Sequence, residues 1–158
     1  MAPATQQTNK DTKDMTAFIS FSIPGVAVSK GRPCISTRGG FARAYTPAPT
    51  VVYEAQVAAA GKQAMADAGM TEVLTTPLNV RIDVFVQIPK SFTKKKREQA
   101  LSADIFPGRP DIDNVAKAIL DALNNVVYED DDQVVNLSVS KRYAIDPFVS
   151  VRISEVLA

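Results

Sequence analysis

The sequence predicts an α/β or α+β fold, in which a mixed β-sheet is packed by helices on at least one face. Residues 78–88 place an apolar side chain at every second of eleven positions, as a strand with one buried face does. Residues 112–123 place apolar side chains three and four positions apart, which is typical of an amphipathic helix. Segments of both kinds are interleaved along the chain, which favours one mixed domain.

The first half of the chain predicts a strand, a long loop and a long helix. Residues 16–23 alternate in their second half and predict a half-buried strand. A helix is expected over residues 50–70, which are rich in Ala and have Gly69 near their end. Five of its side chains are expected to face the core: Val51, Ala55, Ala58, Ala59 and Met65.

The second half is expected to supply the rest of the sheet. The strand over residues 78–88 should be central or nearly central, because one of its sides is wholly apolar (Val80, Ile82, Val84 and Val86). A short helix should follow, capped by Ser91 or Thr93. Residues 133–143 and 147–156 predict two further strands joined by a short turn.

Length and composition indicate one domain. The 158 residues are 46% hydrophobic, enough to bury a core, so we expect a single domain over residues 16–158 after a disordered polar segment over residues 1–15. Cys34 is the only cysteine and His is absent, which excludes a disulfide framework and a Cys/His zinc site. We recognise no signal peptide or membrane-spanning run and expect a cytoplasmic protein.

The net charge of +1 conceals a separation of charge along the chain. Residues 1–100 carry 13 Lys and Arg against 7 Asp and Glu, whereas residues 101–158 carry 5 against 10. A basic half that contacts a polyanion and an acidic half that holds a metal would produce this separation. Uneven surface charge without functional meaning is the alternative.

Two basic segments are candidate phosphate contacts. The loop over residues 24–49 carries Lys30, Arg32, Arg38 and Arg43, with a turn expected at Gly39-Gly40. The short helix after residue 89 begins with Lys94, Lys95, Lys96 and Arg97. Cations at a helix N-terminus oppose the helix dipole, which favours an external anion such as phosphate. A solvated basic surface is the alternative for both segments.

The most informative stretch covers residues 109–133, RPDIDNVAKAILDALNNVVYEDDDQ. Pro110 and the Asn124-Asn125 pair are suitable start and stop signals for the amphipathic helix. The apolar positions of this helix are Val115, Ala116, Ile119, Leu120 and Leu123. Asp113, Lys117, Asp121 and Asn124 share its polar face. Four consecutive acidic residues, 129–132, follow the helix.

Each of these acidic residues has an ordinary structural interpretation. Asp111 could cap the helix, and Asp113 could favour the dipole or form an exposed ion pair with Lys117. Residues 129–132 could form a solvated loop. Taken together, however, up to six carboxylates and a lysine could lie within reach of one another. Such a cluster repels itself unless it holds a cation, and carboxylate oxygens suit Mg²⁺ or Mn²⁺. The consecutive Asp130–Asp132 run does not match an EF-hand.

The sequence PDIDNVAKAILDALN followed by VYEDDDQV resembles the signature of the RusA family of Holliday junction resolvases. In that family Asp-x-Asp-Asn opens a helix, a Lys follows one turn later, and Asp-Asp-x-Gln follows the helix. The segment KGRPCISTRGGFARAYTPAPT also resembles RusA-like phage and bacterial proteins. The resemblance implies Asp111, Asp113 and Asp131 as metal-binding catalytic carboxylates, with Asp130 beside them, and Lys117 as the catalytic lysine. A one-residue shift in the alignment would select Asp132 in place of Asp131.

The resemblance further implies a RusA-like homodimer that uses Mg²⁺, with Mn²⁺ as a substitute, to resolve four-way DNA junctions in recombination and repair. The expected setting is a bacterial host cell or a phage-infected cell. The expected DNA contacts are Lys30, Arg32, Lys94, Lys95, Lys96, Arg97 and Arg109. Two alternatives remain open: a metal-dependent nuclease for flaps or forks, and a DNA-binding protein without catalytic activity.

Overall fold

The computed structural model describes residues 18–32 and 34–156, so the segment expected over residues 1–15 lies outside the described part. A four-stranded mixed sheet forms the centre of the fold, in the order β1-β6-β4-β5. The strands are β1 (Phe18–Pro24), β4 (Leu78–Gln87), β5 (Val134–Ala144) and β6 (Phe148–Glu155). β4 is parallel to β5 and antiparallel to β6, which in turn is antiparallel to β1. The mixed sheet and the internal position of β4 are confirmed.

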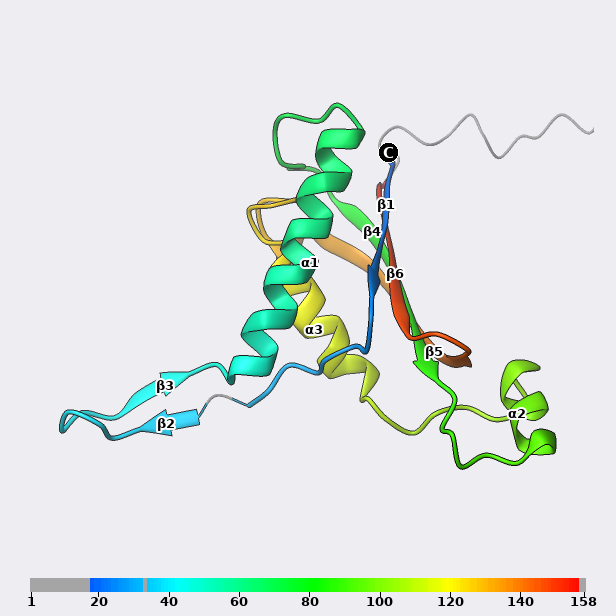
Figure 1. The fold of residues 1–158 in the computed structure, drawn as a ribbon. Helices are drawn as coiled ribbons and strands as arrows, with labels where there is room; N and C mark the ends of the chain where they lie inside the picture. The colour runs from blue at the N-terminus through cyan, green and yellow to red at the C-terminus, as the bar shows by residue number, and fades with distance from the viewer. Residues whose placement is uncertain (1–17, 33, 157–158) are drawn as a thin grey trace, which may run out of the picture.

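Two helices cover one face of the sheet (Figure 1). They are α1 (Ala48–Asp67) and α3 (Ile112–Ala122), close to the helices that the sequence predicts. The short helix α2 (Lys94–Leu101) lies away from them, beyond the far end of β4, and is capped by the Thr93 side chain, which accepts a hydrogen bond from the Lys96 amide. No helix in the described ranges is long and apolar enough to cross a membrane.

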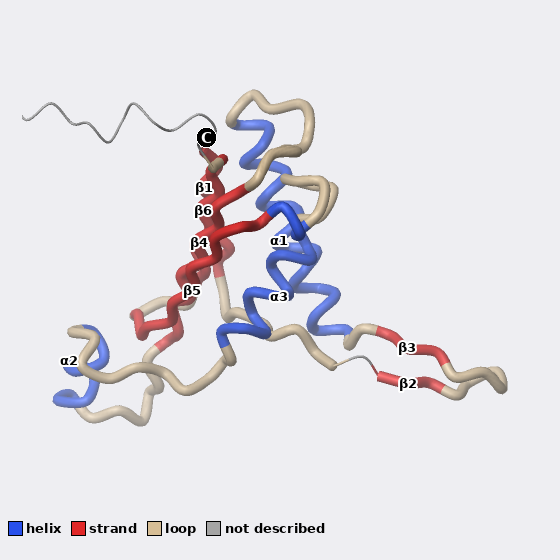
Figure 2. Tube along the Cα trace, turned by 180° about the vertical axis from the view of Figure 1, so that it is seen from behind, coloured by secondary structure: helices blue, strands red, loops and turns tan. Residues whose placement is uncertain are grey.

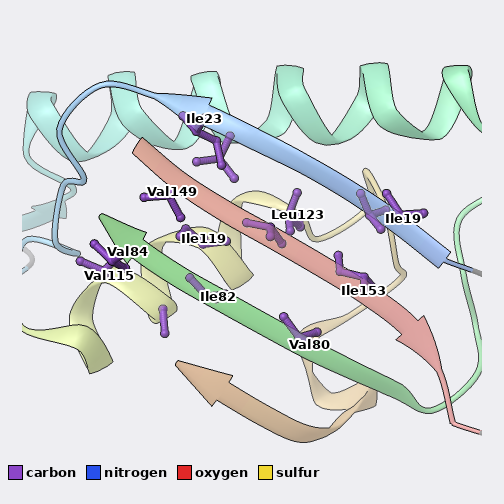
Figure 3. Close-up of a cluster of buried hydrophobic side chains, with 14 of the residues drawn as sticks. Ile19, Ile23, Val80, Ile82, Val84, Val115, Ile119, Leu123, Val149 and Ile153 are labelled. Atoms are coloured by element: carbon purple, nitrogen blue, oxygen red, sulfur yellow. The ribbon is translucent and has the colours of Figure 1, made fainter. Parts of the chain in front are cut away.

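The core lies between the sheet and the helices α1 and α3 (Figure 3). Alternate residues of β4 and β6 enter it, including Val80, Ile82 and Ile153, because successive side chains of a strand point to opposite faces. The helix α3 contributes its predicted apolar side: Val115, Ala116, Ile119 and Leu123 are buried, and Leu120 is half-buried.

The packing face predicted for α1 is largely wrong. Val51 is 51% exposed, Ala55 and Ala59 are exposed, Ala58 is half-buried, and only Met65 of the five predicted positions is buried. The face that packs consists of Thr50, Tyr53, Val57, Gly61 and Met65. Gly61 explains the difference, because a Cβ there would lie 2.6 Å from Leu123 Cδ2. Close approach of the two helices requires a residue without a side chain, and an Ala-rich helix gives little contrast between its faces.

A second, two-stranded sheet projects from the body of the molecule (Figure 1). It pairs β2 (Cys34–Ser36) with β3 (Arg43–Tyr45) around a turn at Gly39 and Gly40, whose φ values are +85° and +81°. This turn is as predicted, since glycine adopts positive φ without steric cost. We call the segment over residues 34–45 the basic hairpin, because it carries Arg38 and Arg43.

Candidate active site

The first turn of α3 presents two exposed carboxylates. Asp111 occupies the N-cap position, but its side chain accepts no capping hydrogen bond, so the capping interpretation is wrong for that carboxylate. Asp113 follows in the first turn and is also exposed. Within the described residues, the carboxylate that forms an ion pair with Lys117 is Asp121, at 3.7 Å, rather than Asp113. Both N-terminal carboxylates of α3 are therefore free to bind a ligand.

A short 3₁₀ helix, Asp131–Gln133, holds the second set of acidic residues. Asp130 caps it: its Oδ1 accepts a hydrogen bond from the Asp132 amide at 3.2 Å, and the Gln133 side chain accepts one from the Asp130 amide at 2.8 Å. The amide group of Gln133 donates to the carbonyl oxygens of Leu74 and Thr76, at 2.9 and 3.0 Å. Gln133 thus fixes the turn that presents Asp131.

A groove between α3 and β5 brings three of the four predicted catalytic residues together. Asp113, Lys117 and Asp131 all line this groove, which encloses about 420 Å³. Its remaining walls are apolar: Ile112, Ala116, Leu120, Leu137 and Val139. Asp132 lines a separate cavity beside Glu129 and Asp130. Of the two residues that the sequence left open as the third aspartate, Asp131 is therefore the one that reaches the groove.

The surroundings of the Asp131 carboxyl raise its pKa. The largest cause is its hydrogen bond with Asp130, followed by burial and by the negative charge of Asp121, while Lys117 acts in the opposite direction. The pKa of Asp130 is lowered, first by the same hydrogen bond and then by the Asp132 amide. A second positive charge in the groove would stabilise ionised Asp131.

The proposed metal ligands are only partly assembled. Within residues 18–32 and 34–156, no group of three or more His, Cys, Asp or Glu side chains lies close enough to hold a metal ion. Asp113 and Asp131 share the groove, whereas Asp111 does not line it and Asp130 is engaged as a cap. The donors that are present nevertheless fit a hard cation, because Asp113 and Asp131 are carboxylates that line the same groove.

Two basic segments, the basic hairpin and α2, lie to either side of the start of α3. In Figures 1 and 2 the first turn of α3 lies between the basic hairpin and α2, at the same end of the molecule. The cations of α2 are exposed (Lys94, Lys95, Lys96 and Arg97), and the Lys96 ammonium lies 4.2 Å from the centre of the Phe92 ring. Arg32 and Arg109 are also exposed.

Lys30 differs from these cations because it lies inside an ion-pair network. Its ammonium contacts Glu54 Oε1 at 2.5 Å and Asp121 Oδ2 at 3.2 Å. The sequence did not indicate this network: Glu54 is 24 positions away from Lys30, on a helix whose packing face was predicted wrongly. Asp121 was at least placed on the same helical face as Lys117.

Lys141 is a residue that the sequence did not single out. Its ammonium, on β5, donates to the Gly108 carbonyl at 2.6 Å and to the Pro110 carbonyl at 3.3 Å. It therefore ties the segment that leads into Asp111 to the edge of the sheet. A single lysine within a strand pattern carries no signal of such a contact.

Comparison with known proteins identifies the family of the chain. Residues 24–154 match the family model described as Endodeoxyribonuclease RusA. The chain is also 38% identical over 143 residues to a Bacillus subtilis (strain 168) protein named "Uncharacterized protein YqaN", and this match covers 89% of the chain and 98% of the relative. The chain therefore belongs to the RusA endodeoxyribonuclease family.

Proposed function

We propose that the protein is a magnesium-dependent endonuclease that resolves Holliday junctions by paired symmetric cuts. The observation that carries the proposal is the groove lined by Asp113, Lys117 and Asp131 in a member of the RusA family. Hydrolysis of a phosphodiester requires a positioned water and stabilisation of the charge that develops on the phosphoryl oxygens. Two carboxylates and an ammonium group in one groove provide the side chains for both requirements.

Asp113 and Asp131, joined by Asp111 from the preceding residues, are the proposed Mg²⁺ or Mn²⁺ ligands. A bound Mg²⁺ would lower the pKa of its water and neutralise charge on the phosphate. The capping hydrogen bond of Asp130 supports a role in holding the turn, and we assign that role to it rather than direct ligation. Lys117 lines the groove and is 63% exposed, which supports our proposal that it contacts the scissile phosphate.

The basic hairpin and α2 are the proposed contacts to the DNA backbone. Both project from the body of the molecule, and exposed cations on projecting segments can follow a phosphate backbone (Figure 2). The hairpin also exposes Ile35 and Phe41, at 73% and 74%, near Arg38 and Arg43. An exposed aromatic ring between cations suits a distorted DNA branch, where unstacked bases are accessible.

A homodimer is the expected assembly. Two symmetric cuts in a four-way junction need two active sites related by a twofold axis, which a C2 dimer provides. We expect analytical ultracentrifugation at micromolar concentration to show a dimer. A fully active protein that sediments only as a monomer would contradict this expectation.

The substrate is tested by a panel of DNAs offered under identical conditions. We expect the four-way junction to be cut fastest, in two strands at symmetric positions, and only with Mg²⁺ or Mn²⁺ present. A flap or fork cut faster than the junction would favour the alternative nuclease. Salt-sensitive binding without cutting of any substrate would favour a DNA-binding protein that has no catalytic activity.

A further inference from the structure

Lys30 connects two helices at the edge of the proposed active site. Its ammonium lies between Glu54 of α1 and Asp121 of α3, and its side chain is only 20% exposed. The two carboxylates are similarly shielded, at 22% and 26% exposure. A lysine held between two shielded carboxylates is poorly placed to reach a DNA phosphate, because it would have to leave both of them.

The backbone around Lys30 is fixed, so its side chain has a defined direction. The Lys30 amide donates to the Asn114 carbonyl of α3 at 2.9 Å, and the next amide, of Gly31, donates to Thr50 Oγ1 at 3.0 Å. Thr50 is 2% exposed. A Cβ at position 31 would lie 2.7 Å from Pro47 Cγ, so only glycine fits this close approach.

Lys30 shares one oxygen atom with the proposed catalytic lysine. Asp121 Oδ2 lies 3.2 Å from the Lys30 ammonium and 3.7 Å from the Lys117 ammonium. The closer and less exposed partner offsets more of the Asp121 charge, since shielded ion pairs are screened less by solvent. Without Lys30, Asp121 would attract Lys117 more strongly and compete with a phosphate for it. The raised pKa of Lys30, caused first by its hydrogen bond with Glu54, is consistent with a permanent positive charge here.

We propose that Lys30 is a positioning residue rather than a DNA contact: it offsets the charge of Asp121 and so leaves the Lys117 ammonium available to the groove. This inference rests on the proposed nuclease function. Lys30 then affects the rate of the catalytic step rather than DNA binding, although the basic loop that carries it was expected to bind DNA.

The test separates catalysis from phosphate binding in Lys30→Met. We expect the single-turnover cutting rate at saturating junction DNA to fall about tenfold or more, because the lysine at the reacting centre is misplaced. The salt dependence of junction binding in EDTA should be unchanged, whereas loss of one phosphate contact would lower the slope of log K against log salt by about 0.9. Lys62→Met, at an exposed α1 position outside the groove, is the matched control.

A second substitution distinguishes charge balance from structural support. Asp121→Asn added to Lys30→Met should recover much of the lost rate, because the unbalanced carboxylate is gone. A reduced salt slope in Lys30→Met, or no recovery in a folded double variant, would overturn the inference. If Lys30→Met does not fold, Lys30→Gln with Glu54→Gln leaves no unpaired carboxylate on α1 and allows the same rate and slope measurements.

Chemical acylation provides a readout that does not depend on nuclease activity. Lys117 should react more slowly with an amine-acylating reagent in Lys30→Met than in the wild type, relative to Lys62 in the same sample, and the Asp121→Asn addition should restore it. Peptide mass spectrometry measures both sites. If the wild type cuts no branched DNA, the proposed function is wrong, but the acylation rates still test the role of Lys30. A reactivity of Lys117 that is unchanged in Lys30→Met would contradict that role.

Discussion

Asp131→Asn is expected to lower the rate of junction cutting at least about 100-fold, whereas Asp132→Asn is expected to retain most of the activity. The two residues are neighbours of identical chemistry, but only Asp131 lines the groove with Asp113 and Lys117. Asp132 lines a separate cavity. The two variants therefore remove the same charge at neighbouring positions, and their comparison tests whether a carboxylate in the groove is required for cutting. Single-turnover cutting of a labelled junction in Mg²⁺ measures the effect.

Measuring the affinity of each variant for the junction distinguishes loss of the cutting step from loss of DNA binding. Asp131→Asn should bind the junction as well as the wild type or better, because a carboxylate that repels phosphate has been removed. Asp113→Asn should behave in the same way. Equal loss of cutting in Asp131→Asn and Asp132→Asn would indicate that the whole turn matters rather than one ligand. Full activity in Asp131→Asn would exclude the proposed metal site.

The elements predicted well are those in which one pattern dominates. The alternation of β4 and the apolar stripe of α3 both reflect a single buried face, so the burial of Val80, Ile82, Val115 and Ile119 follows from periodicity. The cap at Thr93 and the turn at Gly39 and Gly40 are local chemistry that tertiary contacts do not override.

The features that the sequence did not reveal depend on contacts between distant segments. The two last strands are joined by a short turn, as predicted, yet they do not pair with each other: β4 lies between them, parallel to one and antiparallel to the other. No local sequence pattern predicts this order of strands in the sheet. The packing face of α1 depends on Gly61 fitting against Leu123 of α3, which becomes apparent only once the helices are placed.

The candidate site likewise combines features that the sequence predicted with contacts between distant segments that it did not. The spacing of Asp111, Asp113 and Lys117 along one helix was visible in the sequence, and the structure adds that Asp131 lines the same groove as Asp113 and Lys117. The contacts that support this arrangement were not visible, although Gln133 belongs to the Asp-Asp-x-Gln signature. Gln133 acts through carbonyl oxygens near residue 75, and Lys141 acts through those of residues 108 and 110. Backbone carbonyl acceptors have no sequence signature, so such contacts can be identified only once the fold is known.

Metal binding should be detectable as stability, independently of any DNA substrate. A cation that binds only the folded chain raises the free energy of unfolding by about 2.7 kcal/mol at a hundredfold excess over its dissociation constant. For a chain of this length that corresponds to about 5–10 °C in the melting temperature. We expect Mn²⁺, or millimolar Mg²⁺, to produce such an upward shift in the wild type, and Asp132→Asn to retain it.

Asp131→Asn should lose most of this metal-induced shift, yet melt no lower than the wild type in EDTA. The pKa of Asp131 is raised in the folded protein, first by its hydrogen bond with Asp130 and then by burial. A raised carboxyl pKa means that ionisation is less favourable in the folded chain than in the unfolded one, so at neutral pH the Asp131 charge lowers the free energy of unfolding. Removing that charge should therefore leave the melting temperature unchanged or raise it.

Asp113→Asn distinguishes a metal ligand from a residue that only favours the helix dipole. As a ligand, Asp113 should be required for the Mn²⁺ shift, and its replacement should not lower the melting temperature in EDTA, because a like charge beside the groove has been removed. As a dipole partner alone, its replacement should lower the melting temperature slightly, by the few tenths of a kcal/mol typical of a charge in the first turn, and leave the metal response intact. The two roles predict opposite results for the same protein in the same pair of melting curves, and the second result would return Asp113 to a purely structural role.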